Sequence, residues 1–146
     1  MTVVDEKGTT CLVDSNILLY AFIETKDVRK LNIAKSLIQN ENIEITISTQ
    51  IINEVCVNLI KKASFSEERI RQMSISFYNK YNVVEINKEI IFKASEIREH
   101  HKFSFWDSLI VAGALYANVE VLYSEDMQDG FVVDKTKIVN PFKQHM

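Results

Sequence analysis

The sequence predicts an α/β fold, with a parallel sheet covered by helices on both faces. Short apolar or alternating segments typical of strands are separated by longer segments with helical periodicity. This alternation favours crossover connections, which make neighbouring strands parallel. A length of 146 residues and a hydrophobic share of 47% are ordinary for one soluble domain. We therefore expect a single domain over residues 1–146.

Five segments have the composition or the periodicity of strands. They are short, bounded by polar residues and rich in Val and Ile, and one of them alternates apolar with polar side chains. These segments are residues 10–13, 43–47, 83–86, 119–123 and 137–139.

Helices are expected between these strands, and several begin at a capping residue. Apolar side chains recur at helical spacing over residues 28–38 and 50–62. Ser66, Asn87 and Ser104 each precede a further helical segment and suit its N-cap. The helix after Ser104 is almost wholly apolar or small, which indicates burial on most sides.

Four carboxylates occupy positions that an apolar strand or helix does not require. Asp14 and Asp126 follow strand-like segments, whereas Glu54 and Asp107 lie early in helices. In an open parallel sheet these positions share one edge, where ligands bind. Converging carboxylates repel one another unless a cation lies between them, and oxygen ligands suit Mg²⁺ or Mn²⁺. The pattern predicts a metal-dependent phosphoryl-transfer site.

Each of these acids also has a structural explanation that the sequence leaves open. Asp14 suits the N-cap of the following helix. Asp107 lies three residues after Ser104, where an acid complements the helix dipole. Glu54 is compatible with an ordinary surface glutamate, and Asp126 with a turn.

Composition and charge restrict the class of protein less sharply. The net charge of −3 becomes +1 when the four acids are left out, and solvated helix faces explain the clustered basic residues better than phosphate contact does. Cys11 and Cys56 are isolated and are expected to be buried, reduced thiols. Residues 1–10 lack the apolar core of a secretory signal, and no apolar segment approaches a membrane span. We expect a cytoplasmic protein.

Four segments, in this order, resemble the motifs of the PIN-domain nucleases, most closely the VapC-type toxins of prokaryotic toxin–antitoxin pairs. The resemblance covers essentially the whole chain and implies a three-layer α/β/α sandwich with a parallel sheet of about five strands. It further implies a Mg²⁺- or Mn²⁺-dependent endoribonuclease for single-stranded RNA, which forms a homodimer and binds a small antitoxin. The segments are Val13–Leu19, Ser48–Val55, Phe105–Ile110 and Leu122–Gly130.

The chain departs from the family at its last motif, which often ends in Asp-Phe. Here Gly130 follows Asp129, so either Asp126 or Asp129 is the fourth acid, and we favour Asp126. Both would face one site if this segment formed a helical turn. The predicted catalytic metal ligands are thus Asp14, Glu54, Asp107 and Asp126, with Ser15, Asn16, Ser124 and Asp129 as their hydrogen-bonding neighbours.

Two other classes of function stay open. A metal-assisted phosphatase or phosphotransferase could use Asp14 as its nucleophile, although no second Asp follows two residues later and no phosphate loop is present. A catalytically inactive PIN-like binding module would keep the acids only as helix caps. Phe103, Phe105 and Trp106 are expected in the core rather than stacked on unpaired bases.

Overall fold

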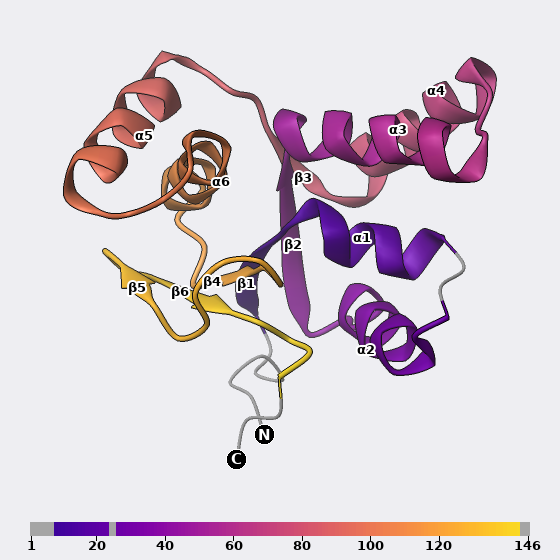
Figure 1. The fold of residues 1–146 in the computed structure, drawn as a ribbon, viewed down its shortest axis with the longest axis horizontal. Coiled ribbons are helices and arrows are strands. Elements are labelled where there is room, and N and C mark those ends of the chain that lie inside the picture. Colours follow the sequence, from indigo (N-terminus) through magenta and orange to yellow (C-terminus); the bar gives the residue numbers. More distant parts are fainter. Residues whose placement is uncertain (1–7, 24–25, 144–146) are drawn as a thin grey trace.

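A computed structural model of the chain describes residues 8–23 and 26–143. The prediction that residues 1–10 are not a secretory signal concerns mostly residues 1–7, which lie outside the described residues. Within it, six strands form one sheet in the order β3-β2-β1-β4-β6-β5 (Figure 1). The strands are β1 (Thr9–Val13), β2 (Ile43–Ser48), β3 (Asn82–Val84), β4 (Val121–Tyr123), β5 (Val132–Val133) and β6 (Thr136–Val139).

The five predicted strands are all present and pair in parallel. Two of them are shorter than predicted, since β3 ends at Val84 and β4 begins only at Val121. The sixth strand, β5, pairs antiparallel with β6 at the sheet edge. It was not predicted because two residues are too few to show a period.

Six helices connect these strands within the described residues. They are α1 (Ser15–Phe22), α2 (Val28–Ile38), α3 (Thr49–Ala63), α4 (Glu67–Lys80), α5 (Lys88–His100) and α6 (Phe105–Tyr116). The predicted caps Ser66, Asn87 and Ser104 each accept a hydrogen bond from a backbone N–H in the first turn of their helix. Ser48 does the same for α3.

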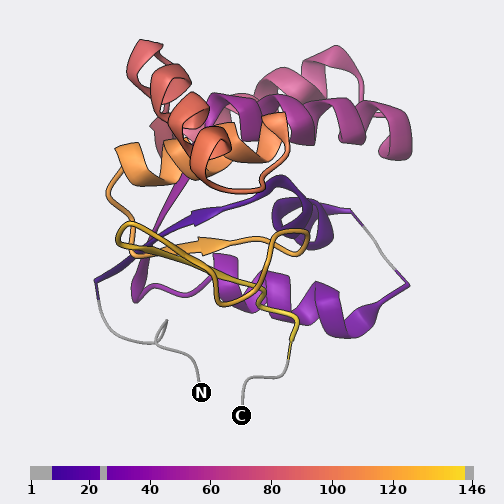
Figure 2. The same cartoon turned by 60° about the vertical axis from the view of Figure 1, so that its left-hand side comes forward.

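The helices cover both faces of the sheet, as the sequence predicted. Helices α5 and α6 pack together on one side, and α1 and α2 lie on the other, where α3 also contacts α1 (Figures 1 and 2). The sheet between them is apolar, and strand residues such as Leu12, Ile47, Leu122 and Ile138 are fully buried. Burial on both faces explains why these strands are nearly continuous apolar runs.

The strand order reverses next to β1. After β1 the chain runs outward through β2 to β3, and it then returns so that β4 pairs with the other side of β1. Helices that diverge at such a reversal leave a crevice at the carboxyl ends of the strands. The carboxyl ends of β1 and β4 are therefore the expected location of a site.

Two smaller observations concern the cysteines and the membrane. Both thiols are free, as predicted, but only Cys11 is buried. Cys56 is partly exposed, and its Sγ lies 3.6 Å from the Oγ of Ser74 in α4. None of the helices in the described ranges combines the length and the apolar character that a membrane span requires.

Candidate active site at the carboxyl edge of the sheet

Asp14 lies at the reversal point and is the most buried of the four acids, at 5% exposed. The register that aligns Val13 with Tyr123 places Asp14 beside Ser124. Its Oδ2 accepts a hydrogen bond of 2.9 Å from Ser124 Oγ, and its Oδ1 accepts one of 2.7 Å from the backbone N–H of Ser15. Asp14 is thus the N-cap of α1, and both of its oxygens are held in place.

Glu54 and Asp107 reach the same edge from helices α3 and α6. Gln50, one turn before Glu54, donates from Nε2 to Glu54 Oε1 and to the backbone oxygen of Trp106, each at 3.2 Å. This amide ties α3 to the first turn of α6. Asp107 is the third residue of α6, and its backbone N–H is capped by Ser104. The predicted capping geometry is therefore present, and it leaves the Asp107 carboxylate half-buried at the site.

Asp126 follows β4 in a loop and is exposed. Its Oδ2 accepts a hydrogen bond of 3.0 Å from Asn16 Nδ2 in α1. Asp129 is held differently, since its Oδ1 accepts from the backbone N–H of Asn140 at 2.8 Å. The segment between these acids is not helical, so the condition under which both would face one site is not met.

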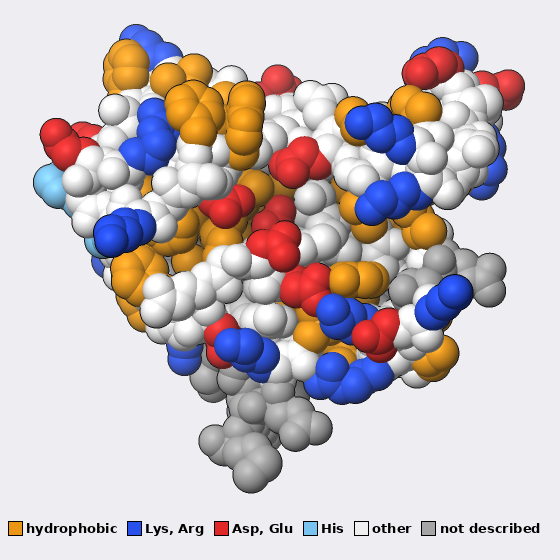
Figure 3. Space-filling view, in the orientation of Figure 1, with side chains coloured by type: hydrophobic (Ala, Val, Ile, Leu, Met, Phe, Trp, Pro, Cys, Tyr) orange, Lys and Arg blue, Asp and Glu red, His pale blue; other side chains and the backbone are white. Residues whose placement is uncertain are grey.

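The four acids form what we call the acidic centre: Asp14, Glu54, Asp107 and Asp126. Figure 3 looks onto this edge and shows acidic side chains gathered in its middle, with Lys and Arg on either side. The centre brings together residues more than a hundred positions apart in the chain.

Burial and mutual repulsion both act on the acidic centre. Burial raises the pKa of Asp14 from 3.8 to about 6, and the charges of Glu54 and Asp107 add to the rise. Burial also raises the pKa of Glu54, and the charge of Asp107 adds to it. Burial likewise raises the pKa of Asp107, and the charge of Asp126 adds to it. Each acid is thus within electrostatic reach of another.

Among the described side chains, no cation offsets this repulsion. In the described ranges, no Lys, Arg or His side chain forms an ion pair with any of the four acids. The donor atoms are carboxylate oxygens with hydroxyl and amide neighbours, which is the chemistry that Mg²⁺ and Mn²⁺ prefer. Across residues 8–23 and 26–143, no three Asp, Glu, His or Cys side chains are already grouped closely enough to hold one ion. The donor set therefore fits a divalent ion, and the exposed or half-buried acids have room to turn towards it.

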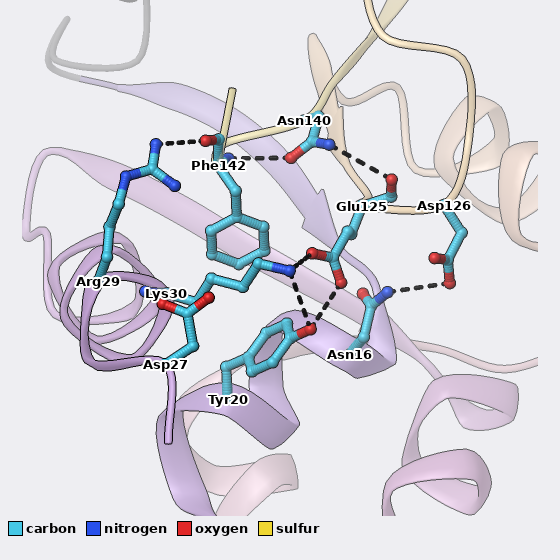
Figure 4. A network of polar contacts seen from close by, with 9 residues as sticks. All are labelled: Asn16, Tyr20, Asp27, Arg29, Lys30, Glu125, Asp126, Asn140 and Phe142. Carbon is cyan, nitrogen blue, oxygen red and sulfur yellow. Dashed lines mark hydrogen bonds and ion pairs between the residues drawn. The ribbon is translucent and has the colours of Figure 1, made fainter. Parts of the chain in front are cut away.

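Glu125, the neighbour of Asp126 in sequence, belongs to a different cluster (Figure 4). It pairs with Lys30 of α2 and accepts a hydrogen bond of 2.8 Å from the hydroxyl of Tyr20. The Lys30 ammonium also lies 5.2 Å from the ring centre of Tyr20 and 5.5 Å from that of Phe142. We call Tyr20, Lys30, Glu125 and Phe142 the lysine cluster. It joins α1 and α2 to the loop after β4.

The aromatic residues before Asp107 do not follow the prediction that they lie in the core. Trp106 is 64% exposed and Phe105 is 55% exposed, whereas Phe103 packs partly against the core. The prediction was wrong for Trp106 and Phe105 because both lie in the first turn of α6, beyond the part of the helix that the sheet covers. Arg98 of α5 lies over the Phe105 ring, 4.3 Å from its centre.

Comparisons with known proteins agree with the motifs and the fold. The sequence profile of the PIN domain family matches residues 11–129. None of the curated proteins compared with the chain matches it.

Several solved structures have a similar fold. A toxin–antitoxin complex from Klebsiella pneumoniae is 22% identical, with a TM-score of 0.67 over 90% of this chain and 97% of that one. VapBC2 from Rickettsia felis, bound to a DNA fragment from its promoter, is 18% identical, with a TM-score of 0.61 over 89% and 97%. VapC20 from Mycobacterium tuberculosis, a toxin that cleaves the sarcin-ricin loop, is 16% identical, with a TM-score of 0.62 over 77% and 86%. At these identities the likeness concerns the fold.

Proposed function

This chain belongs to the PIN domain family, and we propose that it is a divalent-metal-dependent endoribonuclease that cleaves single-stranded RNA as the toxin of a toxin–antitoxin pair. The observation that carries the proposal is the acidic centre. Two of its carboxylates follow strands β1 and β4 and two lie in helices α3 and α6, and no cation among the described residues pairs with them. The VapC20 toxin, which shares the fold, cleaves RNA at the sarcin-ricin loop and supports the choice of substrate.

In this proposal Asp14, Glu54, Asp107 and Asp126 hold one or two Mg²⁺ or Mn²⁺ ions. Such an ion supplies a bound water of lowered pKa and stabilises charge on the phosphoryl oxygens. Asp14 has one fixed orientation because Ser124 and the Ser15 backbone N–H occupy its two oxygens.

The remaining residues of the centre orient their neighbours. Asn16 holds Asp126 towards the centre, and Gln50 holds Glu54 while fixing the start of α6. The in-line attack on phosphorus requires such fixed ligands, because a small misplacement of a reacting group costs much of the rate.

The test is cleavage of an end-labelled single-stranded RNA by the purified protein with Mg²⁺, with Mn²⁺ and with excess EDTA. We expect internal cleavage that needs the metal and is absent in Asp107→Asn. Activity that persists in EDTA would refute the metal mechanism. Hydrolysis of small phosphoesters but not RNA would indicate a phosphatase, and RNA binding without turnover an inactive module.

We further propose an antitoxin partner. The acidic centre, which forms no ion pair within the described ranges, suits an inhibitor that places an Arg or Lys side chain against the carboxylates, since charge-assisted bidentate bonds to guanidinium are strong. Toxin–antitoxin complexes among the structures of similar fold support this partner. Co-expression with the protein of the adjacent reading frame should relieve toxicity. Failure of neighbouring gene products to do so would count against the pair.

A homodimer is the proposed assembly. Phe92 of α5 and Tyr116 of α6 are 64% and 50% exposed and line one surface hollow. Exposed aromatic residues at one place favour an interface. Light scattering at micromolar concentration should give a dimer for the wild-type protein and a monomer for Phe92→Ser. A wild-type monomer would contradict the proposal.

A further inference from the structure

A groove of about 680 Å³ lies between α3 and the first turns of α6, beside the acidic centre. Glu54 belongs to both, so the groove continues directly from the centre. Its volume is in the range of pockets that hold small molecules. The other walls include Asn53, Val57 and Asn58 from α3, Trp106 and Leu109 from α6, and Ile86.

The lining determines what the groove can bind. Among the residues that the structure describes, no Lys, Arg or His lines it, and the carboxylate of Glu54 is its one charged side chain. A phosphate group therefore has no cationic partner in this lining and meets the like charge of Glu54. The walls combine apolar side chains with the amides of Asn53 and Asn58, and side-chain amides both donate and accept hydrogen bonds. One donor of Asn58 is already used, since its Nδ2 donates to the backbone oxygen of Glu54 at 2.8 Å. A ligand that is flat and apolar on its faces and polar at its edges would complement this surface. A nucleobase is such a ligand.

Trp106 is placed to supply the stacking face. Its side chain is 64% exposed although it is large and apolar. Its position is set from two directions, because Gln50 bonds to its backbone oxygen and Phe105 contacts its ring edge to face at 5.2 Å. Figure 3 shows hydrophobic side chains at the surface over α6, next to the acidic side chains. An indole held at the border of a cleft is the platform that single-stranded nucleic acids use for base stacking.

We propose that this groove binds one unpaired nucleobase of the RNA strand, stacked on Trp106, while a neighbouring phosphodiester lies at the acidic centre. The proposal rests on the proposed nuclease function and adds a base-binding position to it. It assigns Trp106, Asn53 and Asn58 to substrate binding and leaves the hydrolysis itself to the four acids.

The sequence provides a direct readout, because Trp106 is its one tryptophan. Its fluorescence should be quenched saturably by a short single-stranded oligoribonucleotide in EDTA, where the proposed cleavage does not proceed. The matched probe is an oligomer of equal length and charge that carries abasic sugars, and it should quench far less. Equal quenching by both oligomers, or by neither, would overturn the proposal.

Substitution gives a second readout. Trp106→Ala should raise the KM for RNA roughly 5- to 150-fold, the range of one lost stacking contact, with a smaller change in kcat. Trp106→Phe should restore part of the affinity. Tyr78→Ala is the matched control, since Tyr78 of α4 is also an exposed aromatic residue but does not line the groove. An unchanged KM in a folded Trp106→Ala protein would overturn the base-binding role.

The two proposals fail in distinguishable ways. RNA cleavage with an unaffected KM in Trp106→Ala would remove the groove and leave the nuclease. Base-dependent quenching without any cleavage would remove the nuclease and leave the groove as a nucleic-acid site. Quenching by an amphipathic helical peptide but not by the oligoribonucleotide would make the groove a protein-docking site and overturn the inference. If Trp106→Ala does not fold, the fluorescence titration of the wild-type protein with the two oligomers tests the base-binding role.

Discussion

The lysine cluster and the acidic centre lie side by side, and both draw on the loop after β4. Glu125 points into the first and pairs with Lys30, whereas Asp126, the next residue, points towards Asn16 and the other acids. A carboxylate next to a cation has its charge balanced and serves to join elements. A carboxylate among other carboxylates has an unbalanced charge, which a divalent ion can balance. Two adjacent acids can therefore have different roles, and the partner of each decides which.

The largest expected effect is the loss of RNA cleavage when an acid of the acidic centre is replaced. Asp107→Asn should lower RNA turnover by more than about 100-fold, yet leave the metal-free protein equally stable or more stable, because repulsion with Glu54 and Asp126 is removed. A thermal melt and a cleavage assay measure both. If Asp107 only complemented the helix dipole, its replacement would instead lower the free energy of unfolding by about 0.3–1 kcal/mol and leave activity unchanged. A less stable but fully active variant would take Asp107 out of the acidic centre.

Between pH 4 and pH 7, a pH effect on stability is expected from the acidic centre. The pKa of Asp14 is raised from 3.8 to about 6, so the folded protein holds this proton more tightly than the unfolded chain. Protonated Asp14 therefore contributes stability that is fully present below pH 4 and is lost as the pH rises to about 6. The loss in the free energy of unfolding is about 3 kcal/mol. The raised pKa values of Glu54 and Asp107 also lower stability as the pH rises.

Urea unfolding in EDTA between pH 4 and pH 7 measures this contribution. The wild-type protein should lose stability relative to Asp14→Asn over that window. Parallel stability curves for the two proteins would show that Asp14 carries no such strain.

Divalent ions should stabilise the acidic centre and not the lysine cluster. An ion that binds only the folded state at 100 times its Kd adds about 2.7 kcal/mol to the free energy of unfolding. Mg²⁺ or Mn²⁺ should therefore raise the Tm of the wild-type protein and of Glu125→Gln, but much less that of Asp107→Asn. An equal rise in all three proteins would place the ion elsewhere.

The smallest effect concerns the lysine cluster. Lys30→Met should lower stability by about 1 kcal/mol, because it removes a partly exposed ion pair and two contacts with aromatic rings. Lys35→Met, on the exposed face of the same helix, is the control and should change stability by less than about 0.5 kcal/mol. Chemical denaturation compares them. Equal stabilities would mean that the cluster contributes nothing measurable.

Local sequence patterns were enough to identify the elements and the chemistry of the site. Helices and strands depend on patterns that extend over a few residues, namely hydrophobic periodicity, apolar segments and N-caps such as Ser104. These patterns located the helices and the five parallel strands. Carboxylates at the ends of apolar segments are costly enough to be noticed without a structure. The family and its fold followed from their order along the chain.

The partners of those residues became known from the packing of distant elements. Nothing near Glu125 in sequence indicates Lys30, which is 95 positions away, because an ion pair between distant elements depends on how helices pack on the sheet. The same is true of Trp106, whose apolar character predicts burial. Its exposure follows from the place where α6 extends past the sheet, and this makes it available beside Glu54. Local sequence patterns report what each residue prefers, whereas packing over long separations decides which residues meet.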